Sequence, residues 1–390
     1  MHVFTTIFVF IFLTMHLIYA KTNDNESQDI GYETNHQKQN DLKLFSRLMV
    51  IGGKNESGFL SDVEMVDPYN TESRCKNIAE FPQKRYFMVA NFINEEPIVC
   101  GGYGNNTFAN LTLEEICFRL DNKTEKWESH HSPSLHYPRA YAAGALINGS
   151  SWWVTGGYHW YFPSFTTSDV LRPKPSTFMP SFLLPEKMMN HCMAAINTTH
   201  VFLAGGSYGT GQQGKSSQVA QFYFLAIFPL LVISLSILLN LPLLYFIHIA
   251  YIVDLRAGSS SFTRLPSMEG KRVSAACGAI FDAKKNETRL IVAGGGEQSS
   301  EVLQISGKNR SNQWREGPKL PREFYMGGYV HDLRNGDWML VGGSDIHGLK
   351  YYADMIRYDK EVEIFEFLPA KLKTRRSAFG ALLAYVTDKC

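Results

Sequence analysis

Short apolar runs that end in a pair of glycines recur along the chain. Residues 49–51 precede the first pair, and five later runs have the same form. The first glycines of successive pairs are 49, 55, 49, 89 and 48 positions apart. One such pair can mark any turn that needs a positive φ angle, but six of them at a spacing of about 50 residues indicate a repeat architecture. The pairs are Gly52-Gly53, Gly101-Gly102, Gly156-Gly157, Gly205-Gly206, Gly294-Gly295 and Gly342-Gly343.

Each repeat has the pattern of four short strands separated by polar turns. A strand of small residues, such as 141–146 or 192–196, precedes the apolar run. A strand of alternating apolar and polar residues follows the glycines, as in 62–67 and 115–120, and a last strand often carries an aromatic residue such as Trp127. A proline and usually an arginine then lead to the next repeat. Four antiparallel strands per repeat are the content of one propeller blade.

This pattern resembles the kelch repeat, in which apolar residues precede a glycine pair, an aromatic residue follows, and a proline-rich turn leads to the next blade. The resemblance covers residues 46–386 and implies an all-β, six-bladed kelch-type β-propeller over residues 43–390. The third unit departs from the pattern, with extra prolines in residues 169–180. The first unit lacks a small-residue strand, whereas residues 377–384 have that pattern and no glycine pair after them. We therefore expect the C-terminal strand to close blade 1 and remove the free edges of an open ring.

The N-terminus has the features of an exported protein. Residues 3–19 are almost wholly apolar and Ala20 supplies the small residue of a cleavage site, so residues 1–20 are interpreted as a secretory signal peptide. Only His2 could carry a positive charge before the apolar core, and a retained N-terminal membrane anchor is the alternative. Residues 21–42 are polar and lack apolar periodicity, which predicts a flexible leader. The expected localisation is secreted or extracellular.

Sequons support export independently, because nine asparagines are followed by any residue but proline and then Ser or Thr. We expect most of them to carry glycans. The sequons are at Asn25, Asn55, Asn105, Asn110, Asn122, Asn148, Asn197, Asn286 and Asn309.

Six cysteines in an exported chain are expected to form disulfides. Cys100 ends the second strand of blade 2 and Cys117 lies in the third, so adjacent antiparallel strands could bring the two to disulfide distance. We therefore predict a Cys100–Cys117 disulfide. Cys75 and Cys390 form a weaker candidate pair across the closure. Cys192 and Cys277, in predicted inner strands, are interpreted as packed small residues.

One hydrophobic segment interrupts the repeat. The chain has no Lys, Arg, Asp or Glu between Lys215 and Asp254, a stretch long enough to cross a bilayer of about 30 Å. A crossing would separate the blades before it from those after it. If residues 219–249 are removed, Gln218 joins Ala250 and the interrupted strand is restored without a gap, with 216–218 and the residues from Ala250 on matching 299–304 of the fifth blade. We interpret these residues as an insertion foreign to the fold, such as an unspliced intron. A membrane hairpin, which would anchor the protein through this segment, is the alternative.

The charge balance and the motifs exclude several classes of function. Lys and Arg total 38 and Asp and Glu 37, without a long run of one sign, so a nucleic-acid partner is not expected. Residues 209–216 match the P-loop pattern, but they lie between predicted strands and not before a helix, and we read them as a flexible loop. His130-His131 is interpreted as a solvated turn, and no cluster has metal-ligand spacing. No cofactor, metal site or catalytic residue is predicted.

Two functions fit this reading. The first is an extracellular module, expected to be monomeric, that binds a protein or glycan through propeller loops. The second is a secreted kelch-type enzyme, either a copper-radical oxidase or a sugar-active enzyme, with a site at the channel mouth. Fold alone does not choose between them. Kelch proteins that act as ubiquitin-ligase adaptors depend on a BTB domain, for which the polar leader has no room.

The sequons point to one face of the propeller as the binding face. Five of the nine fall in turns of one face, so we expect the partner on the opposite face, which carries the loops after the glycine pairs. The longest of these loops is rich in aromatic residues of the kind that dominate binding hot spots. Folding of these rings back over blade 3 is the competing interpretation. The predicted contact residues are Tyr158, His159, Trp160, Tyr161, Phe162, Tyr208, His347 and Tyr351.

Overall fold

The computed structural model of the protein describes residues 45–386 except for 73–74, 76–77, 105–110, 122–123, 130–131, 148, 160–164, 173–176, 211–242, 257–260, 308–309 and 333–335. The chain divides between Lys43 and Leu44, and every described residue belongs to the second unit. The regular secondary structure of these residues is entirely β-strand.

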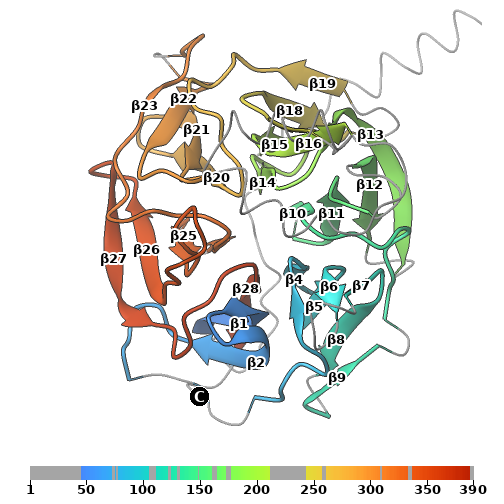
Figure 1. The fold of residues 1–390 in the computed structure, drawn as a ribbon. Helices are drawn as coiled ribbons and strands as arrows, with labels where there is room; N and C mark the ends of the chain where they lie inside the picture. Colours follow the sequence, from blue (N-terminus) through green and yellow to red (C-terminus); the bar gives the residue numbers. More distant parts are fainter. Residues whose placement is uncertain are drawn as a thin grey trace, which may run out of the picture. The chain divides into compact units, whose positions relative to one another are not determined.

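Six antiparallel sheets make up most of the described unit, and Figure 1 shows them arranged around a common centre. Five of these sheets have four strands each. They are β4 (Val89–Ile93), β5 (Glu96–Cys100), β8 (Cys117–Asp121) and β9 (Lys126–Glu128); β10 (Ala143–Ile147), β11 (Ser151–Thr155), β12 (Phe165–Leu171) and β13 (Phe178–Met188); β14 (Cys192–Ala195), β15 (His200–Ala204), β18 (Ala250–Asp254) and β19 (Ser261–Arg264); β20 (Ala276–Asp282), β21 (Glu287–Ala293), β22 (Ser300–Gln304) and β23 (Arg315–Glu316); and β24 (Gly328–His331), β25 (Trp338–Val341), β26 (Asp354–Asp359) and β27 (Ile364–Lys371).

The remaining large sheet joins the two ends of the described chain. It contains β2 (Gly58–Val66), β1 (Phe45–Asn55) and β28 (Gly380–Val386), with Leu48 opposite Leu383. The C-terminal strand therefore pairs with the N-terminal one, as the small-residue pattern of residues 377–384 led us to expect. The pairing covers the edge of β1 that would otherwise be exposed.

The first strand of each four-stranded sheet lies toward the centre, and β13, β19, β23 and β27 lie at the periphery (Figure 1). The innermost strands contact one another in the order β28, β4, β10, β14, β20, β24 and back to β28. Small residues such as Gly144 and Ala145 fill these crowded strands. The described unit is thus an all-β fold of antiparallel sheets that is consistent with a β-propeller.

The core lies between neighbouring sheets. Cys100 of β5 and Val154 of β11 belong to one buried apolar cluster, although they come from different sheets. Similarly, Val50 of β1 and Val341 of β25 share a cluster, and both are fully buried. Apolar residues on both faces of a strand therefore bury area against two neighbours, which explains the unbroken apolar runs before the glycine pairs.

The glycine pairs are required where one sheet meets the next. Gly101 and Gly102 have φ angles of 67° and 86°, and the amide nitrogen of Gly102 donates a 2.8 Å hydrogen bond to the carbonyl oxygen of Arg139, which leads into the next sheet. A Cβ on Gly102 would lie 2.6 Å from the carbonyl oxygen of Tyr86. The glycine pairs therefore recur in the sequence because these positions need a positive φ angle and a close approach to a neighbouring backbone.

The arginines between repeats are buried, and the side chain of each forms hydrogen bonds within one sheet. The Arg139 side chain donates to the carbonyl oxygen of Gly156 at 3.0 Å and pairs with Asp169 at 2.9 Å. Arg272 makes the same two kinds of contact with Gly294 and Glu301. Arg322 and Arg376 donate in the same way to the carbonyl oxygens of Gly342 and Gly52. These bonds satisfy carbonyl groups that the glycine turns leave outside the strand ladders.

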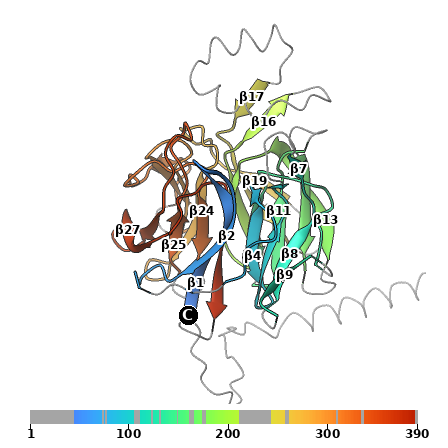
Figure 2. The ribbon, with the colours of Figure 1, turned by 60° about the horizontal axis from the view of Figure 1, so that its bottom comes forward.

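Two smaller sheets accompany the main ones. One contains β3 (Arg85–Tyr86), β6 (Tyr103–Gly104) and β7 (Thr112–Leu113). The other pairs β16 (Ser207–Thr210) with β17 (Leu243–Phe246), and Figure 2 shows this pair standing out from one end of the larger sheets. Gly209 and Thr210, which begin the P-loop-like motif, lie in this antiparallel pair. Residues 211–216 of the motif lie outside the described residues.

The structure corrects the boundaries of the proposed insertion. Residues 243–246 form β17, Ile247 is 3% exposed within a core cluster, and the carbonyl oxygen of Ile249 accepts a 3.0 Å hydrogen bond from the amide of Gly205. Ala250 lies opposite Ala204, the position that Ser300 holds against Ala293 in the next sheet. Residues 243–249 therefore belong to the fold, and the sequence alignment that joined Gln218 to Ala250 is two positions out of register.

The rest of the proposed insertion, residues 219–242, lies outside the described residues, as do the proposed signal peptide and leader. Within the part of the chain that the structure describes, no helix is both long and apolar enough to span a membrane.

Cysteine pairs join strands within one sheet and between two. Cys100 and Cys117 form the predicted pair, with Cα atoms 4.1 Å apart on adjacent strands. Cys192 and Cys277 are buried as expected but are also bonded to each other, with Cα atoms 5.4 Å apart, which links β14 to the neighbouring β20. The sequence could not show that these two inner strands are neighbours. Cys75 is disulfide-bonded, and Cys390, its candidate partner, lies outside the described residues.

Candidate functional site

A closed ring of backbone hydrogen bonds surrounds the centre of the sheets. One residue just before each innermost strand has a left-handed backbone, with φ between 52° and 58°. The amide of each donates to the carbonyl oxygen of the equivalent residue in the preceding sheet, over 2.7 to 3.3 Å, until the circle closes. Non-glycine residues adopt this conformation at a cost, so the surrounding structure must hold them there. The six residues are Phe87, Tyr141, Asn190, Ser274, Met326 and Ala378.

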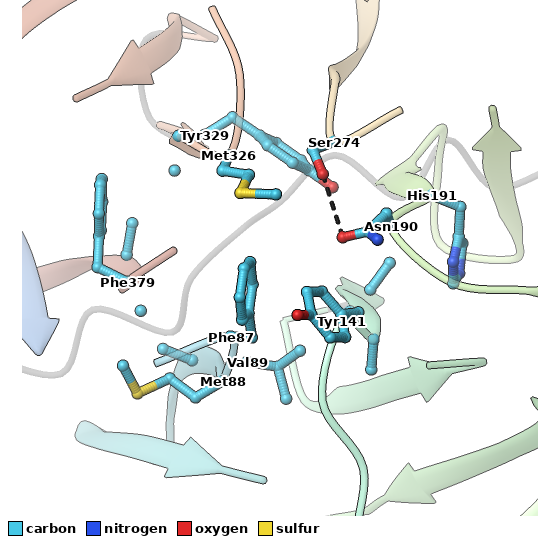
Figure 3. Close-up of a pocket in the computed structure, with 18 of the residues that line it drawn as sticks. Phe87, Met88, Val89, Tyr141, Asn190, His191, Ser274, Met326, Tyr329 and Phe379 are labelled. Carbon is cyan, nitrogen blue, oxygen red and sulfur yellow. Dashed lines mark hydrogen bonds between the residues drawn. The ribbon is translucent and has the colours of Figure 1, made fainter. Parts of the chain in front are cut away.

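A pocket of about 150 Å³ opens at this ring (Figure 3). Five of the six left-handed residues line it, together with residues in or directly before the innermost strands, such as Tyr329 in β24 and Phe379 before β28. The segments that lead into the innermost strands of all six large sheets contribute to the lining. The pocket lies on the face that carries the links between sheets, because each link ends at the start of an innermost strand. The glycine turns lie beside it, since the second glycine of a pair bonds the link that follows, as Gly102 does with Arg139.

One wall of the pocket is aromatic. The rings of Phe87 and Tyr141 lie with their centroids 3.9 Å apart, tilted by 39°. Tyr141 is 5% exposed and packs edge-on against Tyr103 and Tyr158, whereas Phe87 is only half buried. Burial raises the pKa of the Tyr141 hydroxyl well above its usual value. This wall therefore offers an accessible ring held rigidly from behind by tyrosines.

Another part of the lining is polar. The Ser274 hydroxyl donates a 3.1 Å hydrogen bond to Oδ1 of Asn190, drawn as a dashed line in Figure 3, and it also bonds Tyr325. Asn190 is 6% exposed, and its Nδ2 atom is buried without a protein partner. Because Oδ1 is engaged by Ser274, the amide keeps its N–H groups free to serve as donors. A buried donor without an acceptor costs about 1–3 kcal/mol, which a suitable ligand would recover.

Tyr329 extends across the centre of the fold. It belongs to β24, yet its hydroxyl bonds both the amide nitrogen (2.9 Å) and the carbonyl oxygen (3.2 Å) of Met193 in β14, two sheets away. These are backbone groups on the inner edge of β14, which no strand covers. Burial raises the pKa of Tyr329 to about 12. The side chain thus holds a fixed position in the lining and limits how deep a ligand can enter.

The lining is uncharged. None of the described lining residues is Asp, Glu, Lys or Arg. The only lining group that could gain charge near neutral pH is His191, and burial lowers its pKa to about 3. One cation lies beside the aromatic wall: Nζ of Lys54 is 5.7 Å from the centroid of the Phe87 ring, and burial lowers the pKa of Lys54 to about 8. Lys54 is not itself a lining residue.

The residues that the sequence nominated for binding are only partly where we expected them. Tyr158 and Tyr351 are each 8% exposed, because both form bridges beside the glycine turns, to Ala140 and Ser344 respectively. Neither ring can supply an exposed contact, which corrects that part of the prediction. His347 is exposed, and His159 and Tyr208 are half buried. Trp160, Tyr161 and Phe162 lie outside the described residues.

The pocket residues were missed because nothing in the sequence marks them as a group. Their side chains range from Phe to Ser and Ala, and what they share is a backbone conformation. One signal was available: Phe87, Tyr141, Ser274 and Ala378 each stand two positions after an inter-repeat arginine. That position follows the link and precedes the inner strand, so it must lie at the central opening.

The sequons among the described residues lie at two different ends of the sheets. Asn197 and Asn286 are exposed in turns that join the first and second strands of their sheets, at the end away from the ring. Asn55 ends β1 beside a glycine turn. Asn25, Asn105, Asn110, Asn122, Asn148 and Asn309 lie outside the described residues. Among described residues, no group of His, Cys, Asp and Glu is arranged to hold a metal ion.

Comparison with known proteins supports an all-β, propeller-like fold. The chain is similar to the solved structure of YjhT, with a TM-score of 0.56 and 13% sequence identity, over 82% of this chain and 96% of YjhT. At this identity the similarity shows the fold alone. No protein-family model matches the sequence, and no curated protein is significantly similar to it.

Proposed function

We propose that the protein is a secreted, six-bladed kelch-type propeller that binds an extracellular partner through the face containing the central pocket. The six glycine-pair repeats, the six large sheets and the likeness to YjhT support the kelch reading. Cysteine pairs at disulfide distance fit an oxidising, extracellular environment. The apolar N-terminus and the sequons support secretion and glycosylation.

The chemistry of the pocket favours binding over catalysis. General acid–base catalysis needs a group whose pKa lies near the working pH. Tyr141 and Tyr329 have raised pKa values, and His191 has a pKa of about 3, so these lining groups stay neutral between pH 5 and 8. The aromatic wall and the fixed donor of Asn190 instead suit recognition of a ligand that remains unchanged.

The pocket is small, and its size limits what it can hold. Pockets for drug-sized ligands measure roughly 300–1,000 Å³. A volume of about 150 Å³ suits one terminal group of a larger partner, with the surrounding turns contacting the remainder. The proposal is therefore an end-on mode of binding, in which the centre of the face holds the most specific contact.

Affinity capture tests this proposal. The secreted full-length protein would be immobilised, incubated with extracellular material from the source tissue, and compared with the Asn190→Asp variant. We expect a partner that the parent retains and the variant does not. Retention of the same partner by both forms would show that the site lies elsewhere, and conversion of a partner into a new product would favour the enzyme alternative.

A further inference from the structure

Four observations together narrow the chemistry of the group that enters the pocket. The lining is uncharged, one wall is aromatic, Asn190 presents a donor without a protein acceptor, and Tyr329 limits the depth. Each one excludes a class of ligand. The inference drawn from them rests on the proposed function and deepens it.

Charge excludes ionic groups. A carboxylate, sulfate or phosphate would leave water for a pocket whose described lining offers no Lys or Arg, and an ammonium or guanidinium would find no carboxylate there. Burying an unpaired ion costs far more than a single hydrogen bond returns. The occupant is therefore neutral.

The buried amide excludes purely apolar groups. Nδ2 of Asn190 has no partner, and Ser274 holds Oδ1, so the amide cannot rotate to avoid presenting its N–H groups without losing that bond. An aliphatic side chain would fill the space and leave the donor unsatisfied. The occupant must therefore bring an acceptor oxygen to the Asn190 side of the pocket.

The aromatic wall requires an apolar surface on the same small group. Phe87 is half buried: Tyr141 packs against its ring, and Nζ of Lys54 lies 5.7 Å from the ring centroid. A flat patch of C–H bonds could cover the part of the ring that stays exposed. A pyranose ring combines these properties in one unit: hydroxyl or acetamido oxygens that accept hydrogen bonds, and an apolar face of axial C–H groups. Its compact size suits a shallow pocket that Tyr329 limits in depth.

We infer that the central pocket binds the uncharged terminal sugar of a glycan, with Phe87 under its apolar face and Nδ2 of Asn190 donating to one of its oxygens. A charged cap on the same glycan places an ion in the neutral lining and prevents binding. Phe87 and Asn190 are therefore the residues that determine specificity.

A microarray of matched glycan pairs tests this inference. One member of each pair ends in an uncharged hexose or N-acetylhexosamine, and the other carries an added sialic acid or sulfate. We expect the full-length protein to bind uncharged ends at least about tenfold more tightly, a difference of about 1.4 kcal/mol. Equal binding of both members, or preference for the charged one, would overturn the inference.

Two variants and a matched control locate the site. Asn190→Asp replaces the donor with an acceptor of the same shape, and Phe87→Leu removes the ring; each should weaken binding about tenfold or more. Asn94→Asp is the control, because Asn94 has nearly the same left-handed φ as Asn190 (53° against 55°). Asn94 is exposed in the turn between β4 and β5, at the end of β4 away from the pocket. Unchanged glycan binding by the folded Asn190→Asp and Phe87→Leu proteins would contradict the assignment.

Glycan binding and affinity capture, measured together, distinguish a failure of this inference from a failure of the proposed function. If no glycan binds but affinity capture still yields a partner that Asn190→Asp loses, the pocket is a binding site and the sugar inference is wrong. If neither glycan binding nor capture depends on Asn190, both fail. Circular dichroism and thermal unfolding of each variant identify any loss that comes from misfolding.

Discussion

The amide nitrogen of Phe87 donates a 2.7 Å hydrogen bond to the carbonyl oxygen of Ala378, which brings the second repeat and the C-terminal segment together at the centre of the fold. This bond completes the ring of six, and the pairing of β28 with β1 completes the sheet beside it. The geometry of the candidate pocket therefore depends on contacts between the two ends of the described chain.

The glycine pairs should tolerate no side chain where they touch a neighbouring sheet. Gly102→Ala places a Cβ 2.6 Å from the Tyr86 carbonyl oxygen, and we expect a loss of about 2–4 kcal/mol in the free energy of unfolding. Gly149→Ala is the control, since Gly149 also has a positive φ but no atom within 4 Å of the added Cβ. It should cost about 1 kcal/mol. Urea denaturation measures both, and equal costs would show that φ alone requires glycine.

Ile247 tests whether the end of the hydrophobic segment belongs to the fold. It is 3% exposed in the cluster that contains Val201 and Leu203, so Ile247→Ala should lower the free energy of unfolding by about 2–4 kcal/mol. Ile364→Ala, at a residue 45% exposed, should cost less than about 1 kcal/mol. Denaturant titration of the two variants decides the matter: a negligible effect at Ile247 would restore the idea that residues 219–249 are foreign to the structure.

Tyr329 should stabilise the centre as well as limit the pocket. Tyr329→Phe removes the hydroxyl that bonds both backbone groups of Met193, and we expect a loss of about 1–3 kcal/mol. Tyr137→Phe, at a residue 41% exposed, provides the comparison and should change stability by less than about 0.5 kcal/mol. Thermal unfolding followed by tryptophan fluorescence would measure both, and similar small effects would mean that the cross-centre bonds contribute little.

The buried His191 predicts a defined loss of stability in acid. Its pKa falls from 6.5 to about 3 on folding, so below pH 6.5 the unfolded chain binds a proton that the folded protein does not. Stability attributable to this group therefore decreases as the pH falls from 6.5 to about 3, by about 1.4 kcal/mol per pH unit. His191→Gln should show a shallower decline over that range. Parallel stability curves for the two proteins from pH 7 to pH 4 would refute the assignment.

How far the sequence predicts this molecule depends on how each feature is encoded. The glycine pairs and alternating strands repeat at fixed spacing, and Cys100 and Cys117 fall on strands adjacent within one repeat, so these features could be predicted. Contacts between repeats could not: the Cys192–Cys277 disulfide depends on which inner strands are neighbours. Tyr158 was assigned to the surface because its loop is aromatic, whereas its ring packs against Tyr141.

The candidate site was the least predictable part for a physical reason. Its members share a left-handed backbone angle, which sequence marks clearly only at glycine, and here Phe87 and Tyr141 adopt it without glycine. The neutrality of the lining is also a three-dimensional property, because Arg85 and Arg139 lie two residues away in sequence but direct their side chains into their own sheets.

The direction of the central hydrogen bonds has an electrostatic consequence. In a helix the peptide dipoles align, and the end of the helix attracts ions of one sign. In the ring from Phe87 to Ala378 each N–H points to the carbonyl of the preceding sheet, so the N–H and C=O bonds follow one another around a circle and their dipole components along that circle largely cancel. The N–H and C=O groups in these six bonds are already paired with one another, so an approaching molecule is selected at the opening by its shape and by its contacts with the side chains.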